Sequence, residues 1–362
     1  MSKNKKIVNY TRILCILAVV VLLGVGIQSF LFSKGDTPSI FARITHNVET
    51  ENYDVDLVYL WCDGNEPAFW ERKNYWLKQE NRPAMQAVAD GRWEQVDELK
   101  YSLRSVEKYL PWIHHIYVVT DRQVPMWLKT DNPKLTVVDH SEIIPEKYIP
   151  VFNSSAIETS IYKIPGLAEH FLLANDDTFV NRSLKKSFFF QDGKPIFRMQ
   201  LSMLNPQSLY QASLLHTIDL LEKDFGAQIP FFSTRNLAPH HNIDAYLKSD
   251  YEDCANHFEK EYEKTLSHKF RKADDIQRIG VAIWTVMKGH GLVKVVYAST
   301  KKPHRIDSLF ATNTRRNYAK KIASMNPGLF CINDGELSTP QDRMRLKKYL
   351  HKRFPKRSQF EW

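Results

Sequence analysis

The chain has 362 residues, of which 43% are hydrophobic and 12% aromatic, a composition that suits a packed globular core in one large or two ordinary domains. Its four cysteines, Cys15, Cys62, Cys254 and Cys331, show no zinc-ligand spacing and exclude a disulfide framework. The net charge of +9 is concentrated at both ends of the chain, which favours acidic partners such as anionic lipid, nucleotide phosphate or a polyanionic glycan. For the C-terminal cluster, a solvated helix face explains the charge equally well.

The first element that the sequence predicts is a membrane anchor. Residues 13–32 form a nearly unbroken apolar stretch, interrupted mainly by Gln28, and crossing a bilayer takes roughly 20 residues. A secretory signal would have a shorter apolar core and a small-residue cleavage site. Because cations precede the stretch, we expect a single-pass protein with a cytoplasmic basic tail, residues 1–12. Residues 33–53 indicate a stem, which would place the body in a Golgi-like lumen in a eukaryote or at the inner membrane in a bacterium.

Strands and helices alternate through the first part of the body. The apolar runs and the helical spacing predict, in chain order, a strand at 56–61, helices at 69–79 and 97–109, strands at 116–120 and 135–138, a helix at 156–164 and a strand at 171–174. Such alternation is typical of a mostly parallel, Rossmann-like α/β sheet.

The second part of the body has a different pattern. From about residue 205 to 290 it is mainly helical, and strand-like runs follow at 293–297 and 329–332. We therefore expect one α/β domain over residues 54–335 with a helical insertion. Residues 336–362 are predicted as a basic C-terminal helix or tail.

The most informative motif is the triplet Asn175-Asp176-Asp177, which directly follows the apolar run 171–174. Ligands of open α/β sheets bind at the carboxyl ends of the strands. Two adjacent carboxylates there repel each other unless a positive charge lies between them, and a divalent cation that holds a phosphorylated substrate would supply it. A solvated turn is the alternative, because Asn and Asp are common turn residues. Asn333-Asp334 follows a later apolar run in the same way.

Four separated blocks occur in one order along the chain. They comprise residues 56–64, then 98–105 with 152–158 and 175–177, then 241–275, and finally 330–334. In this order they resemble the conserved regions of the Stealth family of hexose-1-phosphoryltransferases, and the ending at 354–361 resembles the bacterial members. Two positions depart from the family pattern: Cys62 replaces a typical valine, and Gln95-Val96-Asp97 replaces an acidic-Asn pair, which leaves the donor sugar open.

The resemblance implies a nucleotide-sugar-binding sheet and a transfer reaction. A hexose- or N-acetylhexosamine-1-phosphate would pass from a UDP-sugar to a hydroxyl of an acceptor glycan or glycoprotein, with release of UMP and with no nucleic acid partner. In such a reaction the protein mainly positions the reactants and neutralises charge. A metal-dependent glycosyltransferase that releases UDP and a non-catalytic, membrane-tethered glycan-binding protein remain alternatives.

The resemblance also assigns roles to individual residues. A cofactor, Mg²⁺ or Mn²⁺, would bind Asp176 and Asp177, with Asp334 as a third ligand or merely a strand-end turn. His241 would be the base for the acceptor hydroxyl, although His240 beside it competes for that role. Arg271 would stabilise the phosphoryl oxygens, because a guanidinium can grip phosphate with two parallel bonds.

The remaining predicted substrate contacts are polar residues that flank predicted strands or lie in or beside predicted helices. They are Asp56, Asp63, Lys100, Arg104, Asn153, Ser154, Glu158, Asn175, Asp275 and Asn333. Some have structural alternatives. Lys100 and Arg104 share one helix face at i, i+4 spacing and can be a surface charge pair, whereas Asn153 and Asp275 can cap the helices that follow them.

Overall fold

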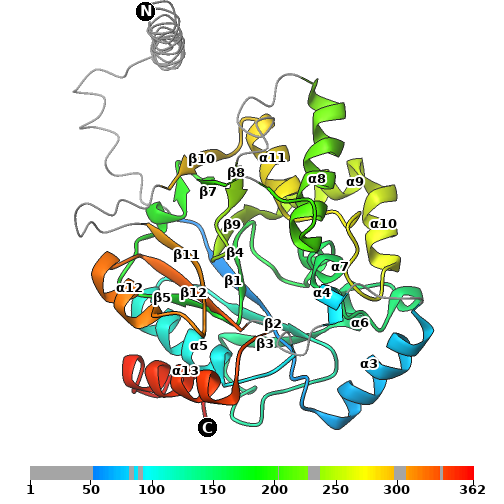
Figure 1. Ribbon diagram of the computed structural model, residues 1–362. Coiled ribbons are helices and arrows are strands. Elements are labelled where there is room, and N and C mark those ends of the chain that lie inside the picture. The colour runs from blue at the N-terminus through cyan, green and yellow to red at the C-terminus, as the bar shows by residue number, and fades with distance from the viewer. Residues whose placement is uncertain are drawn as a thin grey trace, which may run out of the picture. The chain divides into compact units, whose positions relative to one another are not determined.

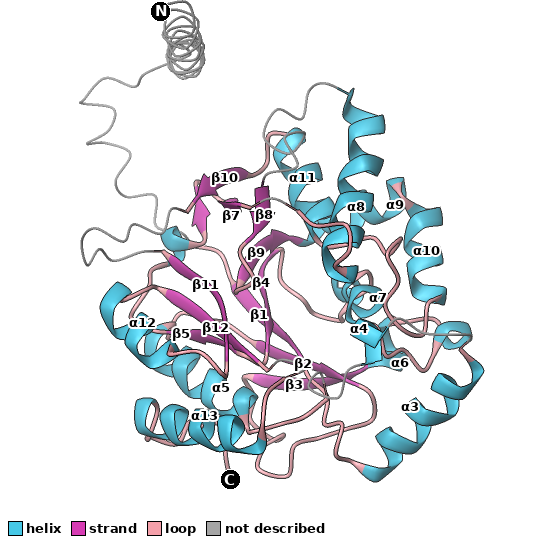
Figure 2. Cartoon of the chain, viewed as in Figure 1, coloured by secondary structure: helices cyan, strands magenta, loops and turns pink. Residues whose placement is uncertain are grey.

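A five-stranded sheet lies at the centre of the computed structural model (Figures 1 and 2). Its order is β3 (Leu135–Asp139), β2 (Ile116–Thr120), β1 (Val55–Leu60), β4 (His170–Asn175) and β9 (Asp244–Leu247). The first four strands are parallel, and β9 pairs antiparallel with β4. The prediction of a mostly parallel sheet is therefore confirmed. The structure describes residues 52–80, 85–88, 93–202, 204–226, 237–296, 307–334 and 337–362.

The central strands are apolar on both faces because helices cover both. In β1, Leu57 and Tyr59 pack into one core cluster together with Leu99. Val58, which points to the opposite face, belongs to a second cluster with Leu214. Near-continuous apolar strands of this kind are typical of parallel sheets.

Two groups of helices form these covering layers (Figure 2). On one side lie the helices that supply the second cluster: α8 (Leu209–Phe225), α9 (Lys248–His257), α10 (Glu259–Ser267) and α11 (Ile279–Met287). On the other side α5 (Glu98–Tyr109) directs Leu99, Leu103 and Val106 into the first cluster. Next to α5 lie α12 (Tyr318–Met325) and α13 (Pro340–Arg353). The predicted helical spacing at 97–109 is thus confirmed.

Two smaller sheets flank the central one. The first joins β10 (Leu292–Val295), β7 (Lys194–Leu201) and β6 (Phe190–Gln191), with β8 (Leu237–Pro239) on β7. The second has the order β11 (Ser308–Asn313), β12 (Leu329–Asn333) and β5 (Thr178–Val180).

The region 205–290 was predicted as mainly helical, and this description is incomplete. It also contains β8 and the edge strand β9 of the central sheet. These strands have three and four residues, too few to show a periodic pattern along the chain.

The remaining elements are short, apart from α3 at Pro67–Gln79. They are α4 (Met85–Val88), α6 (His140–Ile143), α7 (Ser154–Glu158) and the 3₁₀ turns at Glu146–Tyr148, Ile161–Lys163 and Lys186–Phe188. The predicted helix at 156–164 is split into α7 and a 3₁₀ turn. The split occurs at Ser160, whose φ of −113° and ψ of 0° are not helical.

The C-terminal segment packs into the body. Leu346, Leu350 and Phe354 share a core cluster with Tyr101 of α5 and Phe179 of β5. The residues from Tyr53 to Trp362 form one compact unit. In the described part of the chain, the structure has no helix with both the length and the apolarity that a membrane span requires. The predicted basic tail, anchor and stem lie outside the described residues, except for the last two residues of the stem.

A buried ion pair joins α5 to the end of the chain. Arg104 Nη2 lies 2.6 Å from Glu361 Oε2, and the two side chains are only 8% and 5% exposed. Arg104 Nη1 also donates to the Phe354 carbonyl at 2.8 Å. We expect Arg104→Met to lower the free energy of unfolding by about 3 kcal/mol, because it leaves the Glu361 carboxylate buried and unpaired. Urea unfolding would measure the loss.

The control is Lys352→Met, an exposed position on α13, where the change should stay within about 0.5 kcal/mol. The double variant Arg104→Met/Glu361→Gln should regain part of the lost stability. Equal losses in Arg104→Met and Lys352→Met would contradict a stabilising role for the pair.

Candidate active site

The acidic triplet occupies the turn between β4 and β5, at the carboxyl edge of the central sheet. The Thr178 hydroxyl donates to the Asn175 carbonyl at 2.6 Å and closes the turn. On the far side of β5, strand β12 delivers Asn333, whose Nδ2 donates to Asp177 Oδ2 at 2.6 Å. The structure thus brings Asn333 to the triplet, and the cause is the antiparallel pairing of β12 with β5.

Gln95 connects the triplet to the end of β1. Its Nε2 donates to Asp176 Oδ2 at 3.0 Å and to the Cys62 carbonyl at 2.8 Å, while its Oε1 accepts from Trp61 Nε1 at 3.3 Å. Glycine at position 64 allows the chain after β1 to pass close to Trp93, because a Cβ at that position would lie 2.2 Å from Trp93 Cβ. Sequence reasoning noted Gln95 only as a departure from the family pattern, and the structure makes it a direct partner of Asp176.

Two carboxyl groups of the site, Asp176 and Glu98, have raised pKa values. Burial raises the pKa of Asp176, and the neighbouring charge of Asp177 raises it further. Glu98, at the start of α5, is buried as well, and burial together with Asp176 raises its pKa. Together these acidic groups place more negative charge at the half-buried turn than the hydrogen-bond donors Gln95 and Asn333 offset.

His241 is the histidine that meets the triplet. The Nδ2 of Asn175 lies 3.2 Å from His241 Nε2, so the amide orients the imidazole. His240 is held by its backbone, whose N–H donates to the Arg198 carbonyl at 2.9 Å. Burial and the positive charge of Arg198 lower the pKa of His240 to about 4, which makes it a weak base. The geometry therefore favours His241.

The residues of the turn fit a divalent cation. Asp177 Oδ1 is buried and has no hydrogen-bond partner among the described residues. An oxygen of Asp177, a ring nitrogen of His241 and the sulfur of Cys331 all lie within 4.8 Å of one another. Burial and the Asp177 charge raise the pKa of the Cys331 thiol well above its usual range, so the Asp177 carboxylate is a better ligand than the Cys331 sulfur. Oxygen ligands suit Mg²⁺ or Mn²⁺.

A second polar cluster borders the end of β4. Asp244 of β9 pairs in register with Leu173, and Arg278 lies 3.3 Å from Asp244 and 3.7 Å from Glu158. Burial raises the pKa of Asp244 to about 6, although Arg278 opposes this. Sequence reasoning named Glu158 but missed Asp244 and Arg278, because β9 is too short to be recognised.

Arg271 and Ser154 belong to the same region. The Arg271 guanidinium donates to the Ser154 hydroxyl, so these two predicted residues are brought together. Burial lowers the pKa of Arg271, whereas the Glu158 carboxylate raises it. Asp63, a further predicted residue, lies in the loop after β1, where its backbone N–H donates to Gln123 Oε1 at 2.9 Å and its carbonyl accepts from Gln123 Nε2 at 2.9 Å.

Several predicted substrate contacts have structural roles instead. Asp56 is in register with Phe171, near the amino end of β4, and binds His114 Nδ1 at 2.8 Å and the Ala168 N–H at 2.8 Å. Arg104 is committed to Glu361. Lys100 lies 3.5 Å from Asp97, so it does not share a surface charge pair with the buried Arg104.

Asn153 and Asp275 form a buried pair. Asn153 accepts from the Ser155 N–H as the cap of α7 and donates to Asp275 Oδ2 at 2.8 Å. Asp275 also accepts from the Lys272 N–H and lies 2.7 Å from His268 Nδ1. Both residues are fully buried, so neither is available as a direct substrate contact.

Asp334 also differs from its predicted role as a metal ligand. Its Oδ2 is 2.5 Å from Arg343 Nε, and its Oδ1 is 3.4 Å from the Thr314 hydroxyl. Because β12 ends at Asn333, Asn333 and not Asp334 faces Asp177.

Known proteins with similar sequences span most of the chain. Residues 92–197 match conserved region 2 of the Stealth proteins. The chain is 32% identical over 312 residues to the capsular polysaccharide phosphotransferase fcs1 of Haemophilus influenzae, across 83% of this chain and 81% of that protein. It is 29% identical over 341 residues to the exopolysaccharide phosphotransferase cps2G of Lactiplantibacillus plantarum, across 85% and 96%. Among solved structures, the galactosyltransferase LgtC aligns with 84% of this chain and 96% of its own, at a TM-score of 0.36 and 10% identity.

The raised pKa values give the folded protein a pH dependence. Carboxyl groups with raised pKa values in the folded state contribute stability at low pH, below their unfolded values of roughly 4. This contribution is lost as the pH rises through the raised pKa values of Asp176 and Glu98. Without divalent ions, we expect the free energy of unfolding to fall as the pH rises from roughly 4 through the raised pKa values of about 7 for Asp176 and about 8 for Glu98. Urea titrations at successive pH values would measure this fall.

In the same titrations, Asp176→Asn should reduce the slope, and added Mg²⁺ should reduce the loss at the alkaline end. Asp131→Asn, which changes an exposed carboxylate, should leave the slope unchanged. A flat profile for the unmodified protein would contradict the electrostatic description of the turn.

Proposed function

This chain belongs to the Stealth family, and we propose that it transfers a hexose- or N-acetylhexosamine-1-phosphate from a UDP-sugar to a hydroxyl of an acceptor glycan, with release of UMP. The observation that carries the proposal is that Asp177 and His241 meet at one edge of the sheet, with Asp176 adjacent to Asp177 in the same turn. Carboxylates for a cation and an imidazole for a proton are the two kinds of group that such a transfer requires. The capsular and exopolysaccharide phosphotransferases among the relatives support a role in polysaccharide synthesis.

The chemistry divides among the residues of the site. The acceptor hydroxyl oxygen attacks the phosphorus that is bonded to the sugar, and the bond from this phosphorus to the bridging oxygen of UMP breaks. His241 takes the hydroxyl proton, and UMP leaves with the bond electrons. A cation held by Asp176 and Asp177 would supply positive charge for the diphosphate.

The remaining residues position the donor. Gln95 keeps the Asp176 carboxylate oriented, because it donates to Oδ2 and leaves the second oxygen available for the cation. Arg271 supplies donors for the phosphoryl oxygens, and its contact with Ser154 holds the guanidinium at the end of α7. Arg278, placed between Glu158 and Asp244, is a second cation for the same purpose.

Product analysis tests the reaction. With a panel of UDP-sugars, an acceptor glycan and Mg²⁺ or Mn²⁺, we expect UMP to accumulate, and chelation should stop its release. Asp177→Asn should lower kcat/KM by at least about 100-fold, because it removes a ligand charge from the cation site. Release of UDP would instead support a glycosyltransferase.

The matched control for Asp177→Asn is Asp131→Asn, which removes the same charge at an exposed position and should leave the rate unchanged. Binding of glycan without turnover of any UDP-sugar would support the non-catalytic alternative. UMP release that persists after exhaustive chelation would exclude the cation from the mechanism.

The base is tested through the pH profile. His241→Gln should lower kcat by roughly 10²–10⁴-fold, the range for loss of a general base, and should remove the acidic limb of the profile. His240→Gln should have a much smaller effect on kcat. If His240→Gln abolished the acidic limb and His241→Gln kept it, the assignment would be reversed.

A further inference from the structure

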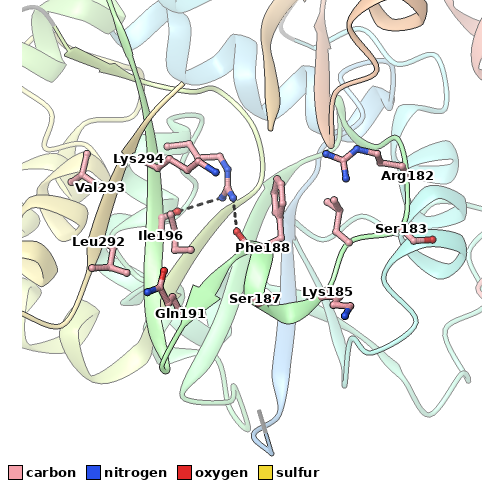
Figure 3. A pocket seen from close by; sticks show the side chains of 12 residues that line it. Arg182, Ser183, Lys185, Ser187, Phe188, Gln191, Ile196, Leu292, Val293 and Lys294 are labelled. Carbon is pink, nitrogen blue, oxygen red and sulfur yellow. Dashed lines mark hydrogen bonds between the residues drawn. The ribbon is translucent and has the colours of Figure 1, made fainter. Parts of the chain in front are cut away.

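A cavity of about 720 Å³ opens between the segment that follows β5 and the strands β7 and β10, a volume in the range of small-molecule sites. Figure 3 shows Arg182, Lys185 and Phe188 on one side of it and Lys294 on the other. Arg198 of β7 contributes to its wall. The residues of the candidate active site are not part of this lining, so the cavity is a separate feature of the surface.

Positive charge dominates the cavity. Its described lining contains no carboxylate and four cations, Arg182, Lys185, Arg198 and Lys294. Polar groups come from Ser183, Ser187 and Gln191. Behind this lining, Asp307 lies 3.3 Å from Arg198 Nε and 2.6 Å from Lys294 Nζ, and one carboxylate does not balance four cations. The cavity therefore suits an anion that also carries hydrogen-bonding groups.

Arg198 makes the wall rigid. Its side chain is 5% exposed, and it donates to the carbonyls of Phe188 and Ile196, as the dashed lines in Figure 3 show. Its guanidinium lies 3.7 Å from the centre of the Phe188 ring. In contrast, Lys185 is exposed and Lys294 is 53% exposed. The two lysines can therefore reach a ligand without a change in the wall.

Both walls of the cavity begin at the active site. Along the first, the chain passes from Asp177 through β5 to Arg182, a stretch that spans at most roughly 18 Å when fully extended. Along the second, the Arg198 carbonyl accepts from the backbone N–H of His240 at 2.9 Å, directly before His241. Two segments of the chain therefore connect the active site with the wall of the cavity.

We propose that the cavity binds an anionic, phosphodiester-linked stretch of the acceptor glycan while the end of that glycan is extended at the active site. This inference rests on the proposed function, because the product of that transfer is itself a glycan phosphodiester. Each product would then be an acceptor with one more phosphodiester for the cavity to bind. The enzyme would therefore extend a growing polymer in preference to a neutral primer.

Other phosphate esters share the same chemistry, notably an anionic lipid headgroup and free phosphate. The lining favours the glycan, because serine hydroxyls and the Gln191 amide accompany the cations. A lipid surface would also need exposed apolar side chains nearby. The large apolar side chains that are exposed in the described residues, such as Trp70 and Met126, do not line the cavity.

The test is a binding measurement on the full chain. The probe is a synthetic tetramer of N-acetylglucosamine joined by 1,6-phosphodiesters, and the comparison ligand is the neutral β-1,6-linked tetramer. We expect the anionic tetramer to bind and the neutral one to bind at least tenfold more weakly. Lys185→Gln/Lys294→Gln should raise the Kd of the anionic tetramer by about tenfold, as expected for partly exposed charge-assisted contacts.

The matched control is Lys348→Gln/Lys352→Gln, which removes the same charge from the exposed face of α13 and should leave the Kd unchanged. Asp177→Asn should also bind the tetramer normally, so the result does not depend on turnover. If no UMP were released but the binding results were as expected, the proposed reaction would be wrong, whereas the proposed anion site in the cavity would still be supported.

Two outcomes would overturn the proposal. One is an equal Kd for the unmodified chain and Lys185→Gln/Lys294→Gln. The other is tighter binding of inorganic phosphate or of phosphatidylglycerol vesicles than of the anionic tetramer through the same two lysines. In turnover assays, Lys185→Gln/Lys294→Gln should have a higher KM for the anionic tetramer than the unmodified chain. Its kcat and its KM for the neutral tetramer should be unchanged.

Discussion

The repulsion between Asp176 and Asp177 is the constraint on which the candidate site depends. The two carboxylates lie in one half-buried turn, and burial together with their mutual charge raises the pKa of Asp176. Keeping such charge away from bulk water costs free energy unless a cation or hydrogen-bond donors compensate. Gln95 and Asn333 supply donors to one oxygen of each carboxylate, and the buried Oδ1 of Asp177 has no partner among the described residues. The cation that we propose for this turn would offset the remaining negative charge.

The rest of the molecule holds this turn in place. On one side, Ser102 of α5 donates to the Thr178 carbonyl at 2.6 Å and lies 2.6 Å from the Tyr59 hydroxyl, which ties the helix to β1 and β5. On the other side, β9 carries Asp244 to the end of β4, and Arg278 joins it to Glu158. Because each of these residues is supported by packed elements, the polar groups are positioned before any ligand arrives, which is how binding sites reduce the cost of ordering.

In our proposal, the active site and the basic cavity bind two parts of one extended ligand. Strand β5 leads from the acidic turn toward the cavity, and β7 returns from the cavity wall toward the histidine pair. The side chains of the active-site turn are acidic, and those of the cavity are basic. In the proposed reaction, the acidic turn would need a cation to bind a diphosphate. The cavity has its own cations on Arg198, Lys185 and Lys294, which suit a phosphodiester directly.

The sequence by itself determined the long elements and the acidic turn, because periodicity and strand exits are local properties: the apolar run before Asn175 and the spacing of Leu99, Leu103 and Val106 both lie within a single element. Only the tertiary structure decided which polar residues meet there. Asp56 and Asn175 belong to neighbouring parallel strands but lie at opposite ends of them. Arg104 turns to Glu361, which is far away along the chain, and Gln95 reaches Asp176 from a loop. Partners of this kind are set by long-range packing, and no spacing within the sequence encodes them.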